Sequence, residues 1–147
     1  MTSLWWTSPP TTAEPVAISE PTPHQRHYAE FYGLTEPPAG YGVVVGNCQA
    51  ESLRIVLDAA DRPTVRVPAV HELTSDEAPR LHALLAGARW LVAQPVRDDY
   101  HGLPLGTRQL RASLRAGARV ATFTPVRYTA LYPFQSPIHV DGVDDVH

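Results

Sequence analysis

The chain has 147 residues, with 12 basic side chains against 15 acidic ones and a formal net charge of −3. This balance argues against a nucleic-acid partner or an anionic membrane, because both bind basic surfaces. No window approaches the roughly 20 consecutive apolar residues that span a bilayer, so we predict a cytoplasmic protein with one domain. The single cysteine excludes an internal disulfide and a multi-cysteine zinc site. All basic residues are arginine, which excludes Schiff-base chemistry on a lysine of this chain.

The first part of the chain, residues 1–38, is rich in proline, and we interpret it as a leader. Trp5 and Trp6 are unusual in such a segment and indicate either loose packing on the domain or a docking peptide. The aromatic spacing of residues 24–34 predicts a short helix. The domain itself is predicted over residues 39–147.

Strands and helices alternate after Gly40. Buried strands are predicted at residues 41–45, 64–70, 90–93 and 119–123. Helices are predicted at residues 50–60, with Leu53, Val56 and Leu57 on the inner face, then from a cap at Thr74 or Ser75 to Gly87, and at residues 107–116. This alternation predicts an α/β fold: three layers around a mostly parallel sheet of about four strands.

Polar residues follow the predicted strands where each strand ends. They are residues 47–49, His71 with Glu72, and residues 94–101, and the fourth strand leads toward His139. Because parallel strands present their carboxyl ends at one edge of a sheet, ligands of such folds bind there. We therefore expect a functional site at this edge.

Cys48 lies where the first strand turns into a helix. Gly46 permits a tight turn there, and the first amides of the helix carry partial positive charge, which favours the thiolate form of a cysteine. The same amides could hold an oxyanion, with help from the side chains of Asn47, Gln49 or Gln94. This is the pattern of a nucleophile at a strand–helix elbow. A buried structural cysteine is the alternative interpretation.

A thiolate nucleophile needs an imidazole nearby, and three histidines are candidates. His71 follows a strand, His101 lies in a polar loop, and His139 precedes Asp141, which could orient it. The acidic tail that ends at His147 is more typical of a solvated segment than of a metal site, so no metal is predicted.

The loop after the third predicted strand is a candidate ligand clamp. Arginine suits phosphate, so Arg97 or Arg108 could hold a nucleotide-like cofactor beside Tyr100 and His101. Walker A and G-x-G-x-x-G motifs are absent from the sequence, so nothing supports nucleotide hydrolysis or dinucleotide chemistry.

Two sequence strings, together with the segment between them, resemble a known family. The strings are Val43-Val44-Val45-Gly46-Asn47-Cys48-Gln49-Ala50-Glu51 and Gln94-Pro95-Val96-Arg97-Asp98-Asp99-Tyr100, the latter followed by Gly102-Leu103-Pro104-Leu105-Gly106-Thr107. The intervening Pro68-Ala69-Val70-His71-Glu72-Leu73 fits as well. Together they resemble the WcbI-type polysaccharide-biosynthesis family, which is regarded as acetyltransferase-like and binds coenzyme A.

The resemblance implies an SGNH-hydrolase-like or flavodoxin-like scaffold with an acyl-transfer site built on Cys48. It implies His139 as the base, with His71, which follows a strand, as the alternative from the residue pattern. The polar-loop residues Arg97, Tyr100, His101 and Arg108 are then the candidates that bind coenzyme A. The expected reaction transfers an acyl group from acyl-coenzyme A to a hydroxyl of a sugar or polysaccharide precursor. Members are commonly longer, so the resemblance also implies a C-terminal half that is absent or supplied by a partner chain or a second copy. A cysteine esterase and a non-catalytic binding module are the alternatives.

Overall fold

The computed structural model describes residues 20–126. The predictions for Trp5, Trp6, His139, Asp141 and the acidic tail concern residues outside this range. The described elements are α1 (Pro23–His27), β1 (Gly42–Val45), α2 (Gln49–Leu57), β2 (Thr64–Val65), α3 (Ala78–Gly87), β3 (Trp90–Ala93), a 3-10 turn (Tyr100–Gly102), α4 (Thr107–Ala112) and β4 (Arg119–Thr122).

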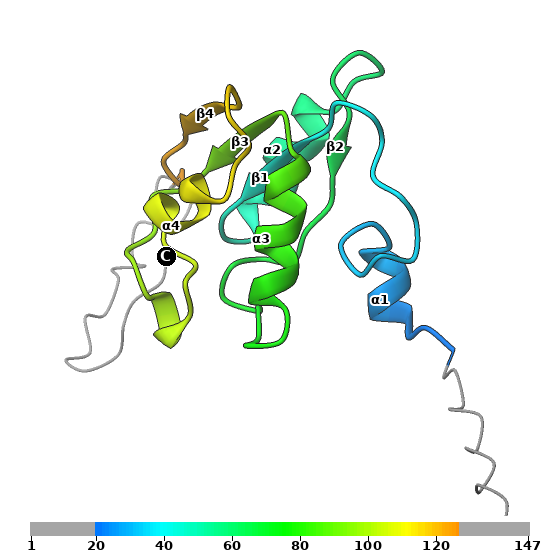
Figure 1. Cartoon of the computed structure of the whole chain (residues 1–147), viewed down its shortest axis with the longest axis horizontal. Helices are drawn as coiled ribbons and strands as arrows, with labels where there is room; N and C mark the ends of the chain where they lie inside the picture. Colours follow the sequence, from blue (N-terminus) through cyan, green and yellow to red (C-terminus); the bar gives the residue numbers. More distant parts are fainter. Residues whose placement is uncertain (1–19, 127–147) are drawn as a thin grey trace, which may run out of the picture.

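The strands form one parallel sheet in the order β2-β1-β3-β4, which confirms the predicted α/β fold with helices. From β1 the chain moves to β2 on one side, and then crosses back over β1 to β3. Since such crossovers are right-handed, the reversal places α2 on one face of the sheet and α3 and α4 on the other. In Figure 1, α3 lies in front of the sheet and α2 behind it.

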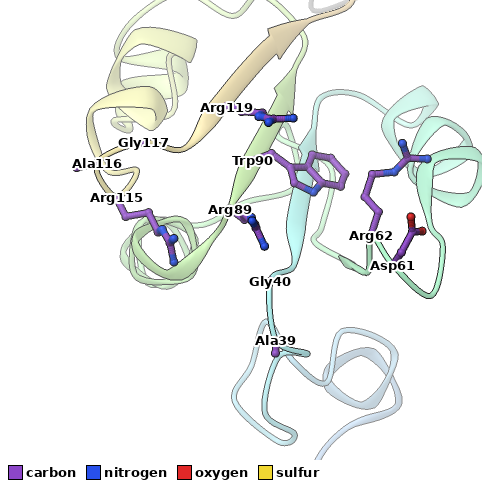
Figure 2. A pocket seen from close by; sticks show the side chains of 10 residues that line it. All are labelled: Ala39, Gly40, Asp61, Arg62, Arg89, Trp90, Arg115, Ala116, Gly117 and Arg119. Carbon is purple, nitrogen blue, oxygen red and sulfur yellow. The ribbon is translucent and has the colours of Figure 1, made fainter.

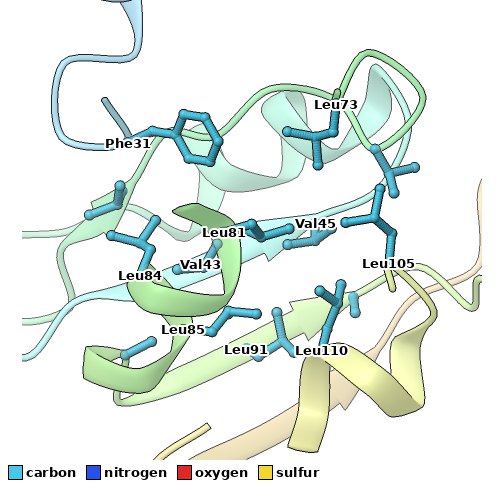
Figure 3. Close-up of a cluster of buried hydrophobic side chains, with 14 of the residues drawn as sticks. Phe31, Val43, Val45, Leu73, Leu81, Leu84, Leu85, Leu91, Leu105 and Leu110 are labelled. Carbon is cyan, nitrogen blue, oxygen red and sulfur yellow. The ribbon is translucent and has the colours of Figure 1, made fainter. Parts of the chain in front are cut away.

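The main core lies between the sheet and the face covered by α3 and α4. Alternate strand residues, such as Val43, Val45 and Leu91, point into it, where they meet Leu81 and Leu85 of α3 (Figure 3). The chain before β1 also takes part: Phe31 is 4% exposed and belongs to the same cluster, although it falls within the predicted leader. Burial of these apolar side chains fixes the sheet and therefore the ends of its strands.

Helix α2 differs from its predicted pattern. The sequence predicts Val56 on the inner face, but Val56 is 76% exposed and its neighbour Ile55 is 58% exposed. Ala50 is the one buried residue of this helix. The periodicity identified the helix correctly but assigned Val56 to the wrong side. Only the first turn of α2, through Ala50, is buried, and the later apolar residues of the helix are left uncovered within residues 20–126.

Other elements are also shorter than predicted. Helix α3 begins at Ala78, with Glu77 as its N-cap, and not directly after Thr74 or Ser75. The strand expected at residues 64–70 ends at Val65, because Pro68 lacks the N–H that a ladder needs and Val70 instead donates to the carbonyl of Gly46 at 2.9 Å. The helix expected at residues 24–34 stops at His27, since the following turns carry Phe31 into the core. The helix expected at residues 107–116 ends at Ala112.

Helices in the described part of the chain are short. The longest, α3, has ten residues, and within residues 20–126 we find none of the length and apolar character that a bilayer crossing requires.

Candidate functional site

The candidate site lies where β1 and β3 end side by side. These neighbouring strands are connected to helices on opposite faces, so the chain diverges there and leaves a crevice beyond the carboxyl ends. The segment from Gly46 to Gln49 leaves β1 at this point, and Gln94 follows β3 directly. The structure therefore brings together Cys48, Gly46, Asn47, Gln49 and Gln94, as the sequence predicted for these five residues.

Gly46 is required by the close approach of Gln94. A Cβ at residue 46 would lie 2.9 Å from Gln94 Oε1 and 3.0 Å from both Gln94 Cβ and the ring of Phe123. The absent side chain lets Gln94 Oε1 accept a hydrogen bond from the backbone N–H of Asn47 at 2.9 Å. Because a backbone N–H can only donate, this bond fixes which end of the Gln94 amide faces the elbow. Gln94 itself is 7% exposed.

Asn47 holds the start of α2. Its Oδ1 accepts from the N–H of Gln49 at 2.9 Å, and its carbonyl accepts from Ala50 at 2.9 Å. The turn thereby satisfies two of the helix's first amides. At the elbow, the N–H of Cys48, Asn47 Nδ2 and Gln94 Nε2 have no hydrogen-bond partner within residues 20–126. All three belong to groups on or next to the elbow.

Gln49 is engaged in a different way from its neighbours. Its Nε2 donates to the carbonyl of Val126 at 2.8 Å, and its Oε1 accepts from the N–H of Val126 at 2.9 Å. This two-bond clamp ties the chain that follows β4 to the start of α2. The side chain of Gln49 thus holds a neighbouring segment of the chain through both of its polar atoms.

Cys48 is exposed and opens onto a small cavity of about 180 Å³. One wall is apolar, formed by Val67, Pro68 and Ala69, and the other carries Glu51 and Glu72. Glu51 is held by Arg54 at 2.7 Å and by Arg66 at 2.5 Å. Burial tends to raise the pKa of Glu51, but the hydrogen bonds from the two arginines outweigh it and lower the pKa, so this carboxylate stays ionised.

Tyr28 completes the cavity and responds to these charges. Its pKa is raised, first by burial and then by the negative charges of Glu72 and Glu51, which keeps the phenol protonated at neutral pH. Glu72 has no ion pair within the described part of the chain. The cavity therefore combines an exposed thiol, an apolar wall, a phenol and two carboxylates, of which Glu51 is ion-paired.

The predicted histidines are placed unequally. His71 is exposed and follows Val70, whose N–H is bonded to Gly46, so it lies at the same edge as Cys48, although Glu72 rather than His71 lines the cavity. His101 is exposed in the loop after β3, with a left-handed backbone (φ 52°). His139 lies outside the described residues.

The predicted clamp loop forms a separate cleft of about 480 Å³. It is lined by Arg97, Arg108 and Arg111 and by residues at the ends of β3 and β4. Arg108 pairs with Asp98, which raises its pKa first through their hydrogen bond and then through the opposite charge. Tyr100, expected at the ligand, is instead 3% exposed and belongs to the core, where its ring contacts His101 edge-on at 4.2 Å.

Several residues of the site were not predicted. The sequence pattern marks Glu72 only as a member of a polar cluster, and it does not single out Arg111 within the helix predicted at residues 107–116. Thr107 was read as a helix start, yet its hydroxyl donates to the carbonyl of Gln94 at 2.9 Å and accepts from Val96 at 2.8 Å. These contacts join segments distant in sequence, and only Thr107 had a local signal, since it lies next to Gly106 in the second motif.

Fold and site together define an α/β protein with an exposed cysteine at a strand–helix elbow, at the point where the order of a parallel sheet reverses. A family model described as "Polysaccharide biosynthesis enzyme WcbI" matches residues 41–146. The chain therefore belongs to the WcbI family of polysaccharide biosynthesis enzymes, as the two motifs predicted.

A solved structure confirms the fold. It is a native structure of WcbI, a polysaccharide biosynthesis enzyme, described as lacking a disulfide bond between coenzyme A and a cysteine of that protein. The TM-score is 0.61 at 20% sequence identity, over 74% of this chain and 38% of the other. The present chain thus spans well under half the length of that structure. No curated protein matches the chain.

Proposed function

We propose that the chain is an acyltransferase that uses acyl-coenzyme A to acylate a hydroxyl of a saccharide. The observation that carries this proposal is the exposed thiol of Cys48 on an elbow where the Cys48 N–H, Asn47 Nδ2 and Gln94 Nε2 have no partner within residues 20–126, at the ligand-binding edge of the sheet. The family's role in polysaccharide biosynthesis supports a saccharide acceptor, and the coenzyme named for the solved WcbI structure supports the donor.

The donor set suits an acyl thioester. When bound, acyl-coenzyme A would supply an activated acyl group with a thiol as leaving group. The Cys48 thiolate attacks the acyl carbonyl, and the N–H of Cys48, Asn47 Nδ2 and Gln94 Nε2 stabilise the oxyanion. Collapse breaks the original carbon–sulfur bond, and Cys48 then carries the acyl group as a new thioester.

A base then activates the acceptor. His71, or His139, takes the proton from the saccharide hydroxyl, and the resulting oxygen nucleophile attacks the acyl carbon on Cys48. The Cys48 thiolate leaves as the ester product forms, and the protonated histidine then gives its proton to solvent, which regenerates the free enzyme. The Glu72 carboxylate accepts a hydrogen bond from a second hydroxyl of the acceptor, and the wall of Val67 and Pro68 contacts its apolar face.

The cleft at the ends of β3 and β4 is where we place the phosphates of the coenzyme. Arg97, Arg108 and Arg111 line it, and guanidinium groups bind phosphate through paired hydrogen bonds. Of the loop residues assigned to the coenzyme in the sequence, His101 is exposed and could contact it, whereas Tyr100 supports the loop from the core.

Trapping the acyl group on Cys48 tests the proposal. The full chain is mixed with acetyl-coenzyme A, quenched in acid and examined by intact mass. We expect a mass increase of one acetyl group and release of free coenzyme A, both absent in Cys48→Ala. Full transfer activity in Cys48→Ala would exclude the covalent route, and failure of the unaltered chain to bind or cleave acetyl-coenzyme A would contradict the proposed function.

Histidine variants separate the two half-reactions. A variant that lacks the base still forms the acyl-thioester but cannot pass it on, so the acetylated form accumulates. We expect this for His71→Ala or for His139→Ala, with transfer slowed by about 10²–10⁴-fold, the usual contribution of general-base catalysis. His82→Ala is the control, because His82 lies on α3 and contacts Ser113 and the carbonyl of Pro104. Normal turnover in both base variants would show that neither histidine is the base.

A further inference from the structure

A second cavity lies at the opposite edge of the sheet, at the amino ends of the strands. Its volume is about 570 Å³, within the range of roughly 300–1,000 Å³ typical of small-molecule sites. Its walls come from the chain before β1, the turn between α2 and β2, the starts of β3 and β4, and the turn after α4. It shares no residue with the cavity beside Cys48 or with the cleft at the end of β3.

This cavity is strongly basic. Arg62, Arg89, Arg115 and Arg119 line it, against one acidic residue, Asp61. Within residues 20–126 the guanidinium groups of Arg89, Arg115 and Arg119 form no hydrogen bond or ion pair, and Arg62 uses only Nε, which donates to the carbonyl of Leu57 at 2.9 Å. Four like charges gathered in one hollow repel one another, and an anion relieves this repulsion.

An aromatic ring lies at the centre of the cavity. Trp90 is half-buried, and Figure 2 shows its indole between Arg119 and Arg89 on one side and Arg62 on the other. The ring lies against Gly42: a Cβ at residue 42 would fall 1.9 Å from Trp90 Cε2. Gly42 therefore allows the indole to lie flat on the strand, with its opposite side available for a ligand.

Ring and charges together select the ligand. Indole stacks with flat heterocycles, and arginine binds phosphate oxygens in pairs. An acidic saccharide, with one carboxylate on each sugar ring, would leave most of the positive charge of the four arginines uncompensated. A diphosphate group compensates much of that charge. We propose that this cavity is a binding site for a nucleoside diphosphate, with the base on Trp90 and the diphosphate between Arg89 and Arg119. The site lies beyond the acyl-transfer site and does not depend on it.

Calorimetric titration of the full chain with UDP tests this site. UDP is chosen because it is not a fragment of coenzyme A. Inorganic pyrophosphate and uridine supply the charge and the ring separately. We expect UDP to bind more tightly than either, and its affinity to fall as salt is added. No heat with UDP, or a UDP affinity no better than that of pyrophosphate, would overturn the proposal.

Variants locate the binding site. The double change Arg89→Ala and Arg119→Ala removes two exposed side chains and should weaken UDP binding at least about tenfold, from the loss of charge-assisted hydrogen bonds. The double change Arg26→Ala and Arg80→Ala removes the same net charge from exposed positions elsewhere and should leave UDP binding unchanged. Arg108→Ala and Cys48→Ala should also bind UDP normally. Equal weakening in the charge-matched control, or weakening only in Arg108→Ala, would refute the location.

Discussion

Gly46 leaves the space in which the side-chain amide of Gln94 reaches the elbow. Its missing side chain is replaced in space by the Gln94 amide, which bonds to Asn47 and keeps Nε2 free for a ligand. The same glycine accepts from Val70 through its carbonyl, and so connects the segment that carries His71 to the elbow. One residue thus couples the candidate oxyanion donors to the candidate base.

Gly46→Ala should therefore damage catalysis more than stability. The new Cβ would press on Gln94 and Phe123, and overpacking of this kind costs about 1–3 kcal/mol of unfolding free energy. Displacement of Gln94 removes one oxyanion donor, for which we expect a loss of about 10²–10³-fold in the rate of acyl-thioester formation. The measurements are urea unfolding and the mass-based trapping assay. Normal trapping in a destabilised Gly46→Ala protein would show that Gln94 takes no part in the chemistry.

At the scale of elements, the sequence predicted those strands and residue positions that depend on the local residue pattern. Residues 90–93 form a strand with the predicted bounds, because an apolar run between Arg89 and Gln94 has no competing interpretation. Cys48 and Gln94 could be placed at one edge because parallel strands share their direction. Two features could not be predicted: the hydrogen bond between Gln49 and Val126, and the position of Glu72 in the cavity beside Cys48. Both depend on how distant segments meet in the tertiary fold.

Substitutions can test whether the apolar residues of α2 that are exposed contribute to stability. Val56 is 76% exposed, so Val56→Ala should change the unfolding free energy by less than about 0.5 kcal/mol. The matched change Val43→Ala, in β1, removes a side chain of 0% exposure and should cost about 2 kcal/mol, because it leaves a cavity in the core. Both values follow from urea denaturation midpoints. A large cost at Val56 would mean that a surface outside residues 20–126 covers it.

At the scale of the whole molecule, a hydrogen bond from Tyr32 joins the chain before β1 to Glu77, the N-cap of α3. The Tyr32 hydroxyl donates to the Glu77 carboxylate, and Thr74 donates to the same carboxylate through its N–H and its hydroxyl, each at 3.0 Å. Burial first, and then the bond to Glu77 and its charge, raise the pKa of Tyr32 from 10.0 to about 12. Burial tends to raise the pKa of Glu77, but its hydrogen bonds outweigh this and lower it from 4.5.

These opposite shifts predict how stability depends on pH. Glu77 is more acidic when folded, so its contribution is present above pH 4.5 and is lost as the pH falls through its lower folded pKa. Tyr32 holds its proton more tightly when folded, so its contribution is complete below pH 10.0 and is lost as the pH rises toward about 12. Tyr32→Phe should cost about 1 kcal/mol at neutral pH, the usual net value of one such bond. Urea unfolding of the two proteins from pH 3 to about 12 should show this difference shrinking at both extremes, while the other tyrosines, common to both, cancel. A difference that stays constant up to the alkaline limit would mean that Tyr32 and Glu77 do not share a proton-dependent bond in the folded chain.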